Sequence, residues 1–179
     1  YPLCVCFCEK CALVQLDYVI PTDVTFGDQY TYLTGSSESL ITYYTELARK
    51  LVDKFSLRAG DTVIEIGSND GSFLKNFKKH NFEHLGFEPS KNVADYSKKH
   101  SRVNVFNDFF NLNNVEKFKQ YKSKTDLICA ANVICHIPNL KEVIKCIDYL
   151  LSKKGVFVFE EPYLGSMFKK NSYDQIYDA

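Results

Sequence analysis

The sequence predicts an α/β fold built on an open parallel sheet. The first observation is an alternation of apolar, β-branched segments with amphipathic helical patterns, which is typical of βαβ units with right-handed crossovers. The second is a glycine-containing turn, Gly67–Gly71, that joins an apolar strand to a helix. We expect strands near residues 62–67, 84–88, 103–106, 125–131 and 155–160, and helices near 71–80, 90–99, 113–120 and 139–151.

The N-terminal residues predict half of a zinc ribbon. The first segment alternates like a β-strand, and a second strand follows the sequence Cys8-Glu9-Lys10-Cys11. A C-x-x-C knuckle between two strands supplies two of the four ligands of a closed tetrahedral zinc site. Cys8 and Cys11 are therefore candidate zinc ligands in the intact protein, and buried thiols are the alternative. Cys4 and Cys6 could stand in for the missing pair only as a poor tetrahedron, because they share a face with Cys8.

A connector covers residues 17–38 and is rich in tyrosine, threonine, aspartate and glycine. Its later part carries aromatic and hydroxyl groups, among them Tyr32 and Ser36, that can close over a ligand; a polar surface loop is the alternative. We expect Ser37 or Ser39 to cap a helix that runs to about Phe55. The inner stripe of that helix is predicted to contain Leu40, Tyr43, Tyr44, Leu47 and Leu51.

The stretch from Thr62 to Phe77 organises the rest of the chain. Strand, turn and helix together form the corner that faces a nucleotide in open α/β sheets. Glycines 67 and 71 stand where the backbone must bend or let a ligand approach closely. A dinucleotide site would read G-x-G-x-x-G and would hold a pyrophosphate. Asn69 replaces the middle glycine and Asp70 follows it, so an NAD dehydrogenase is disfavoured.

The acidic residues near this turn indicate which kind of nucleotide cofactor it would bind. Glu65 and Asp70 flank the turn, where two carboxylates repel a phosphate but suit a ligand that carries an ammonium or sulfonium group. Glu88 ends the next strand, roughly twenty residues on, at the place of the ribose-binding acid. This combination resembles the S-adenosylmethionine (SAM) site of class I methyltransferases. An ordinary βαβ unit with solvated carboxylates is the alternative.

Further candidates follow the other strands, because ligands bind beyond the carboxyl ends of a parallel sheet. Pro89 directly follows Glu88. Asp108 is placed to accept from an adenine amino group and Phe109 to pack on the ring, although Asp108 could instead be a turn residue. Asn132 can meet the amino acid end of SAM. His136 lies one turn further, near the expected methyl group; a structural histidine is the alternative.

Further expectations concern two helix caps, one turn and the end of the last strand. Ser90 and Asn139 stand where helices should begin and are plausible caps. Gly155 follows a basic helix end and predicts a turn into the last strand. Glu160 and Glu161 end that strand and are expected to face the same cleft as His136.

Composition places the chain among globular proteins. With 179 residues, 45% hydrophobic and 25% charged, it can bury one good core. A net charge of +0 gives no support to binding of nucleic acid or of an anionic membrane. We find no signal peptide and no apolar run long enough to span a bilayer. Scattered cysteines beside a cofactor-type fold predict a reducing, cytoplasmic location.

Specific motifs extend through nearly the whole chain. The chain resembles the sugar C-methyltransferases of antibiotic deoxysugar pathways, which act on TDP-linked 4-keto sugars. Motifs in family order and at family-like spacing carry the resemblance: CEKCALVQL, YTYLTGSSES, VIEIGSNDGSFL, LGFEPSKNVA, NDFF, AANVICHIPNL, GVFVFEEPYLG and YDQIYD.

The resemblance implies a zinc-binding domain, a central SAM-binding methyltransferase domain and a C-terminal domain. Residues 1–38 would be the remnant of the first domain with its connector, and residues 39–179 would be the class I, Rossmann-like SAM domain. Such a sheet has seven strands and this chain offers five, so we expect the last two to lie beyond Ala179. The chain opens on Tyr1 rather than on Met and stops at Ala179 without a helix end or turn, so we expect both ends to belong to a longer protein. The positions expected to bind the cofactor are Ser36, Glu65, Gly67, Asn69, Asp70, Glu88, Pro89, Asp108, Phe109 and Asn132.

The implied reaction begins at a carbon next to a ketone. A general base removes the proton, the resulting enolate attacks the SAM methyl group in line, and donors near the keto oxygen stabilise the developing charge. By motif, Tyr32, His136 and Tyr177 match the family's Tyr and His positions near the methyl group. The family continues after the YDQIYD-like stretch to a Glu-His pair whose histidine is the favoured base. Here the chain stops at Ala179, so that base would lie beyond it.

Two other functions remain open from the sequence. One is a SAM-dependent methyltransferase that transfers to oxygen or nitrogen of another small molecule, which needs no enolate. The other is a SAM-binding module that does not catalyse a reaction and serves as a scaffold or sensor.

Overall fold

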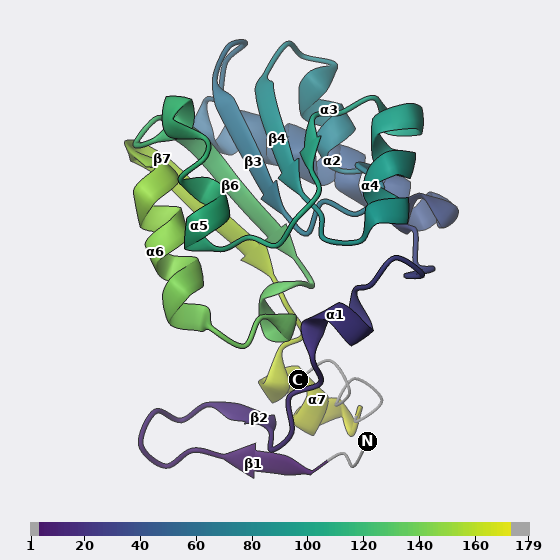
Figure 1. Cartoon of the computed structure of the whole chain (residues 1–179), viewed down its shortest axis with the longest axis vertical. Helices are drawn as coiled ribbons and strands as arrows, with labels where there is room; N and C mark the ends of the chain where they lie inside the picture. Colours follow the sequence, from purple (N-terminus) through teal and green to yellow (C-terminus); the bar gives the residue numbers. More distant parts are fainter. Residues whose placement is uncertain (1–3, 173–179) are drawn as a thin grey trace.

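A five-stranded parallel sheet forms the body of the molecule (Figure 1). The structure is a computed structural model that describes residues 4–172. The strands lie in the order β5-β4-β3-β6-β7, and every neighbouring pair is parallel. Their bounds are β3 (Thr62–Ile66), β4 (Glu83–Phe87), β5 (Val105–Phe106), β6 (Thr125–Ala131) and β7 (Leu151–Glu160). This arrangement confirms the predicted α/β fold, with the first strand of the expected series at the centre.

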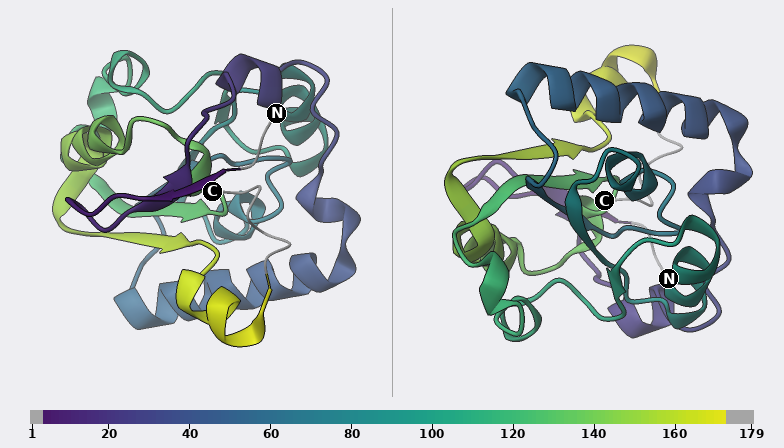
Figure 2. Two further views of the ribbon diagram at one scale, coloured as in Figure 1. Left: turned by 90° about the horizontal axis from the view of Figure 1, so that it is seen from below. Right: turned by 90° about the horizontal axis from the view of Figure 1, so that it is seen from above.

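Helices cover both faces of this sheet, and Figure 2 shows the sheet between its two helical layers. Side chains alternate along β3, so Val63 packs into one apolar cluster and Ile64 into the other. The first cluster includes residues of α2 (Glu38–Phe55), α3 (Leu74–Lys78) and α4 (Lys91–Tyr96); the second includes residues of α5 (Leu112–Val115) and α6 (Leu140–Leu150). Burial on both faces explains the apolar runs of β3 and β6, whereas β7 at the edge of the sheet contains Lys153 and Lys154 and has no fully buried residue.

The remaining elements are short. An antiparallel hairpin of β1 (Val5–Phe7) and β2 (Val14–Leu16) precedes the sheet, as expected from the alternating pattern. The other short elements are α1 (Thr22–Thr25), η1 (Thr34–Ser36), η2 (Ser97–Ser101, a π-helical turn), η3 (Lys119–Tyr121), η4 (Ile134–His136) and α7 (Leu164–Lys170). None of the helices among residues 4–172 is long and apolar enough to cross a bilayer.

Two of the expected helix caps form and one does not. Ser37 accepts a hydrogen bond from the Leu40 amide, and Asn139 accepts one from the Glu142 amide. Ser90 precedes α4 but does not cap it, because its hydroxyl donates to the carbonyl of Phe26 in the connector at 3.0 Å. The expected cap at Ser90 is therefore wrong.

Two further expectations are corrected. Gly155 does not make a turn: β7 begins directly after α6, and Gly155 lies inside the strand beside a register shift. A Cβ at this position would lie 2.4 Å from the Thr125 carbonyl oxygen, so close backbone approach explains the glycine. Tyr43 is also not on the inner stripe of α2, because it is 41% exposed and donates a hydrogen bond to Glu160.

Candidate functional site

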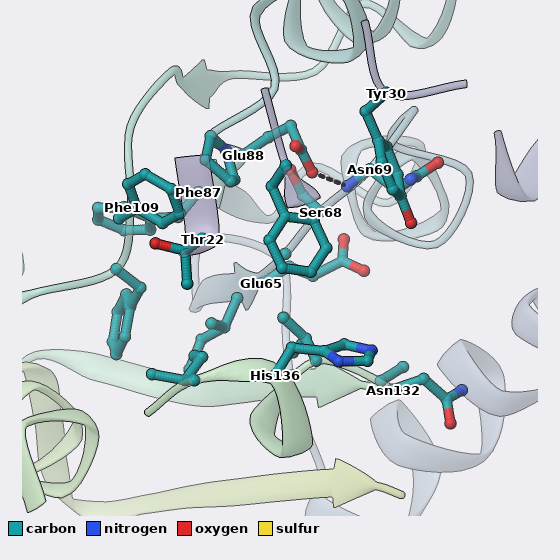
Figure 3. A pocket seen from close by; sticks show the side chains of 18 of the residues that line it. Thr22, Tyr30, Glu65, Ser68, Asn69, Phe87, Glu88, Phe109, Asn132 and His136 are labelled. Atoms are coloured by element: carbon teal, nitrogen blue, oxygen red, sulfur yellow. Dashed lines mark hydrogen bonds between the residues drawn. The ribbon is translucent and has the colours of Figure 1, made fainter. Parts of the chain in front are cut away.

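A cavity of about 460 Å³ opens beyond the carboxyl ends of β3, β4 and β6. The strand ends form its floor, and the connector and η4 form opposite walls. Figure 3 shows Glu65 between the Glu88–Asn69 side and the His136–Asn132 side. The cavity therefore lies where open α/β sheets bind nucleotides.

The turn after β3 requires unusual backbone conformations. Gly67, Asn69 and Gly71 have positive φ angles of +64°, 46° and +75°. A Cβ at Gly67 would lie 2.6 Å from the Val133 side chain, so a larger residue would collide with the segment that leads into η4. Asn69 tolerates the left-handed region better than most residues do. The sequence G-S-N-D-G is thus suited to this tight turn.

Glu88 ties the turn to the end of β4. Its carboxylate accepts a hydrogen bond from the Asn69 amide at 3.0 Å (Figure 3) and another from the Ser90 amide at 2.8 Å. Burial raises the pKa of Glu88, and these hydrogen bonds counteract part of the rise. Because a carboxylate has about four lone-pair sites, Glu88 can still accept from two ligand hydroxyls.

Glu65 is buried at the floor of the cavity, where it is 5% exposed. Among the described residues its Oε2 atom has no hydrogen-bond partner. Burial is the largest cause that raises the pKa of Glu65 well above its usual range, and the carboxylates of Asp70 and Glu88 add to it. A buried oxygen without a partner is costly, and a donor or cation brought by a ligand would satisfy it.

The connector is held over the cavity by side chains of the sheet region. Asn69 accepts from the Thr34 amide and donates to the Tyr32 carbonyl, at 3.0 and 3.1 Å. Asn92 donates to the Tyr30 carbonyl at 2.7 Å. The sequence pattern suggested that this segment closes over a ligand, and the structure places Tyr30, Tyr32 and Thr34 in the cavity wall.

The opposite wall is built from the loop after β6. Its backbone turns at Asn132, which has a φ of 53° and whose amide donates to the Glu160 carbonyl at 2.7 Å. Glu161 accepts from the amides of Val133 and Ile134, at 3.1 and 2.7 Å. These bonds place His136 on the cavity wall, with its ring 5.6 Å from the ring of Phe26.

The carboxylates that end β7 do not line this cavity. The Glu161 carboxylate accepts hydrogen bonds from amides of the loop after β6, and the Glu160 carboxylate accepts one from the Tyr43 hydroxyl. The expectation that both would face the cleft is therefore wrong, because both serve as acceptors for neighbouring segments.

Most candidates from the sequence meet at the cavity. Those in its wall are Tyr32, Glu65, Gly67, Asn69, Glu88, Pro89, Phe109, Asn132 and His136. The structure places Ser36, Asp70 and Asp108 outside the wall. Asp70 accepts from the Gly35 and Ser72 amides, and Asp108 accepts from the Phe109 amide, as a turn residue does. Tyr177 lies outside the described residues.

Sequence reasoning missed several lining residues. Ser68 lies inside the turn and could have been found from its position, whereas Thr22 and Phe26 come from a connector with no periodic signal. Phe26 is brought in by a hydrogen bond from Ser90, 64 residues away in sequence. Only the folded structure shows such a contact.

The hairpin cysteines are not fully buried in this structure. Cys8 is half-buried, Cys11 is exposed, and hydrogen bonds from Cys11 lower the pKa of the Cys8 thiol. The described residues also bring Cys4, Cys6 and Asp17 together, with ligand atoms within 4.8 Å of one another. Cys8 and Cys11 do not belong to that group.

Comparisons with known proteins agree with this geometry. A family model described as a methyltransferase domain matches residues 40–178. C-methyltransferase NovU of Streptomyces niveus is 31% identical over 177 residues, which are 99% of this chain and 42% of NovU. The chain thus spans less than half the length of this relative.

Solved structures share the fold. The PH0226 protein from Pyrococcus horikoshii OT3 gives a TM-score of 0.61 at 16% identity, over 82% of this chain and 65% of that chain. A putative S-adenosyl-L-methionine-dependent methyltransferase from Methanococcus maripaludis gives 0.58 at 18% identity, over 75% and 66%. The chain belongs to the methyltransferase-domain family, and its fold is that of the SAM-dependent methyltransferases.

Proposed function

We propose that this chain forms the cofactor-binding part of a SAM-dependent C-methyltransferase that acts on a TDP-linked keto-deoxysugar. The observation that carries the proposal is the charge of the cavity. Its described lining contains three carboxylates, of which Glu65 and Glu88 are buried and Glu142 is partly exposed, and neither lysine nor arginine. A pyrophosphate would find no cation there, whereas a cofactor with an ammonium and a sulfonium group would find two buried carboxylates.

The residues present fit SAM part by part. Glu88 would accept from the ribose hydroxyls, and Phe109 would pack against the adenine ring. Glu65 would face the positively charged end, where its Oε2 atom gains a partner. Bound SAM supplies an electrophilic methyl group. The connector, held down through Asn69 and Asn92, would exclude water from that group.

Transfer to carbon is supported by the likeness to NovU, which is named a C-methyltransferase. A carbon nucleophile forms only when a proton next to the ketone is removed. His136 and Tyr32 both line the cavity, where they could move that proton and hold the keto oxygen. Tyr177 belongs to the same proposal through its motif. The proposal also includes a structural zinc ion at Cys8 and Cys11 in the intact protein.

Deuterium exchange tests the carbon chemistry separately from methyl transfer. A TDP-4-keto sugar incubated with the full-length protein and S-adenosylhomocysteine in D₂O should exchange the proton next to its ketone, as followed by NMR. The full-length protein is needed because the favoured base of the resembled family would lie beyond Ala179. His136→Gln should slow this exchange at least tenfold while the affinity for S-adenosylhomocysteine stays unchanged. The matched control is Tyr43→Phe, which removes the hydroxyl of a side chain outside the cavity.

Two results would count against this account. Absence of exchange above the rate of the protein-free solution would favour transfer to oxygen or nitrogen, or a module without catalysis. Equal losses of exchange and affinity in the His136 variant would instead assign His136 a structural role.

A further inference from the structure

A second cavity, of about 440 Å³, lies on the other side of the turn that bounds the cofactor cavity. Ser72 lines both cavities, and Asp70 lines only the second. Its walls come from α3, from the end of α4 with η2, and from the connector. Its lining consists of Gly35, Ile41, Asp70, Ser72, Lys75, Lys78, Lys79, Tyr96, His100, Ser101 and Arg102.

The charged side chains that line this cavity are mostly cationic. Four of its residues are lysines or arginine, and the one carboxylate, Asp70, already accepts from the Gly35 and Ser72 amides at 2.6 and 3.0 Å. None of the four cations forms an ion pair within residues 4–172. In a chain with 22 basic and 22 acidic residues, this is a local separation of charge.

The cations are arranged around one space by the local backbone. Lys75 and Lys78 lie on α3, and Lys79 caps it in a helical conformation, so the i, i+3, i+4 spacing places the three lysines on one face. Opposite them, the π-helical turn η2 carries His100, and Arg102 follows it in a left-handed conformation. Lys78 donates to the carbonyl of Arg102, which joins the two walls.

Unpaired cations are common on this surface, since the described residues form only two ion pairs, Arg49–Asp53 and Lys91–Asp95. The second cavity differs because four cations line one hollow whose single carboxylate already accepts from two backbone amides. One wall carries the stacked rings of Tyr96 and His100, with centroids 3.9 Å apart.

We propose that this second cavity binds a small phosphate-bearing molecule. Lysine ammonium groups and an arginine guanidinium are the usual partners of phosphate oxygens, and Lys75, Lys79 and Arg102 supply them. The hydroxyl of Ser101 lies beside them, although it donates to the Asp70 carbonyl in this structure. The volume suits a ligand of nucleotide size. This site is separate from the cofactor cavity and does not depend on the reaction proposed above.

Calorimetric titration with inorganic pyrophosphate at constant ionic strength tests the site. We expect binding to the unaltered chain, and at least tenfold weaker binding to the double variant Lys75→Ala/Lys79→Ala. The matched control is Lys169→Ala/Lys170→Ala on α7, which removes two exposed lysines away from the cavity and should bind as the unaltered chain does. Binding should also weaken as salt is raised.

A second titration with ADP identifies the source of the phosphate. Tighter binding of ADP than of pyrophosphate, lost in Tyr96→Leu, would assign the site to a nucleotide; equal binding would assign it to a free phosphate group. The affinity for S-adenosylhomocysteine, measured on every variant, should stay unchanged and shows separately whether the cofactor site is intact. Absence of pyrophosphate binding at millimolar concentration, or equal losses in both lysine variants, would overturn the proposal.

Discussion

The two cavities beside the Asn69–Asp70 turn carry opposite charges, and they hold those charges in different ways. In the first cavity Glu65 and Glu88 are 5% exposed, and the amides of the turn hold Glu88 in place. In the second, Lys78, Lys79 and Arg102 are exposed and make no ion pair among the described residues. Burying a carboxylate costs free energy, whereas leaving a lysine in water costs little. The carboxylates of the first cavity are therefore held in place by the fold itself, whereas the cations of the second cavity lie on the surface and contribute little to folding.

Asp70 lies between the cavities, and its replacement should have the largest effect. Asp70→Ala leaves the amides of Gly35 and Ser72 without their acceptor, which releases the connector from the turn. We expect the free energy of unfolding to fall by about 2–4 kcal/mol. Each of the two hydrogen bonds to a charged group contributes about 1.5–3 kcal/mol, and loss of the repulsion between Asp70 and Glu65 offsets part of their sum. Urea denaturation followed by circular dichroism measures this change.

The control for this prediction is Asp95→Ala, which removes an exposed carboxylate paired with Lys91. Surface pairs of this kind contribute little, so its unfolding curve should overlay that of the unaltered chain. If both variants unfolded at the same urea concentration, Asp70 would not hold the two cavities together.

Replacing Glu88 should affect ligand binding next most strongly. Glu88→Gln keeps the shape of the side chain but removes the charge that would face the ribose in the proposed complex, and it exchanges one acceptor for a donor. We expect the affinity for S-adenosylhomocysteine to fall by about 1–3 kcal/mol, a factor of roughly 5–150. Glu116→Gln, an exposed residue outside the cavity, is the matched control. An unchanged affinity would remove Glu88 from the cofactor site.

Glu65 should make stability depend on pH. Burial and the carboxylates of Asp70 and Glu88 raise its pKa in the folded chain, so the folded chain keeps this proton at pH values where the unfolded chain has lost it. The contribution is fully present below the unfolded pKa of about 4.3 and is lost as the pH rises through the folded pKa. Glu65→Gln removes this slope, which is at most about 1.4 kcal/mol per pH unit for one proton.

Unfolding free energies between pH 4.5 and pH 8 measure that slope. The difference between the two curves reports the titration of Glu65 together with its electrostatic coupling to Glu88 and Cys129, whose pKa values are also raised. Parallel curves would mean that Glu65 titrates as it does in the unfolded chain.

The smallest effect is expected on the basic side. Lys75→Ala/Lys79→Ala should change the free energy of unfolding by no more than about 0.5 kcal/mol per site, because neither lysine forms an ion pair within the described residues. Urea denaturation again measures the change. A loss as large as that of Asp70→Ala would show that these cations serve folding rather than ligand binding.

The sheet could be predicted from the sequence because its signals are local. Strands buried on both faces are continuous apolar runs, and the turn glycines mark where β3 ends. Helix details were less predictable: the patterns for 90–99 and 113–120 became short helices followed by a π-helical and a 3₁₀ turn. Gly155 was misread because a glycine after a basic helix end normally marks a turn, and here close backbone approach requires it instead.

The candidate site likewise contains residues that the sequence could predict and residues that it could not. Residues at strand ends, such as Glu65, Glu88 and Asn132, could be placed from topology alone, because all parallel strands end at one edge. The roles of Asp70 and Glu161 could not, because both carboxylates bind amides of segments distant in sequence. The contribution of Phe26 depends on a hydrogen bond from Ser90, which a sequence pattern does not reveal.

Calorimetric titration of the chain with S-adenosylhomocysteine, with NAD as the control, tests the central claim most directly. A cavity with two buried carboxylates and no lining cation should bind one S-adenosylhomocysteine per chain at micromolar concentration and should not bind NAD. Binding of NAD, or no binding of S-adenosylhomocysteine to a chain with a folded circular dichroism spectrum, would contradict the assignment of this cavity to SAM.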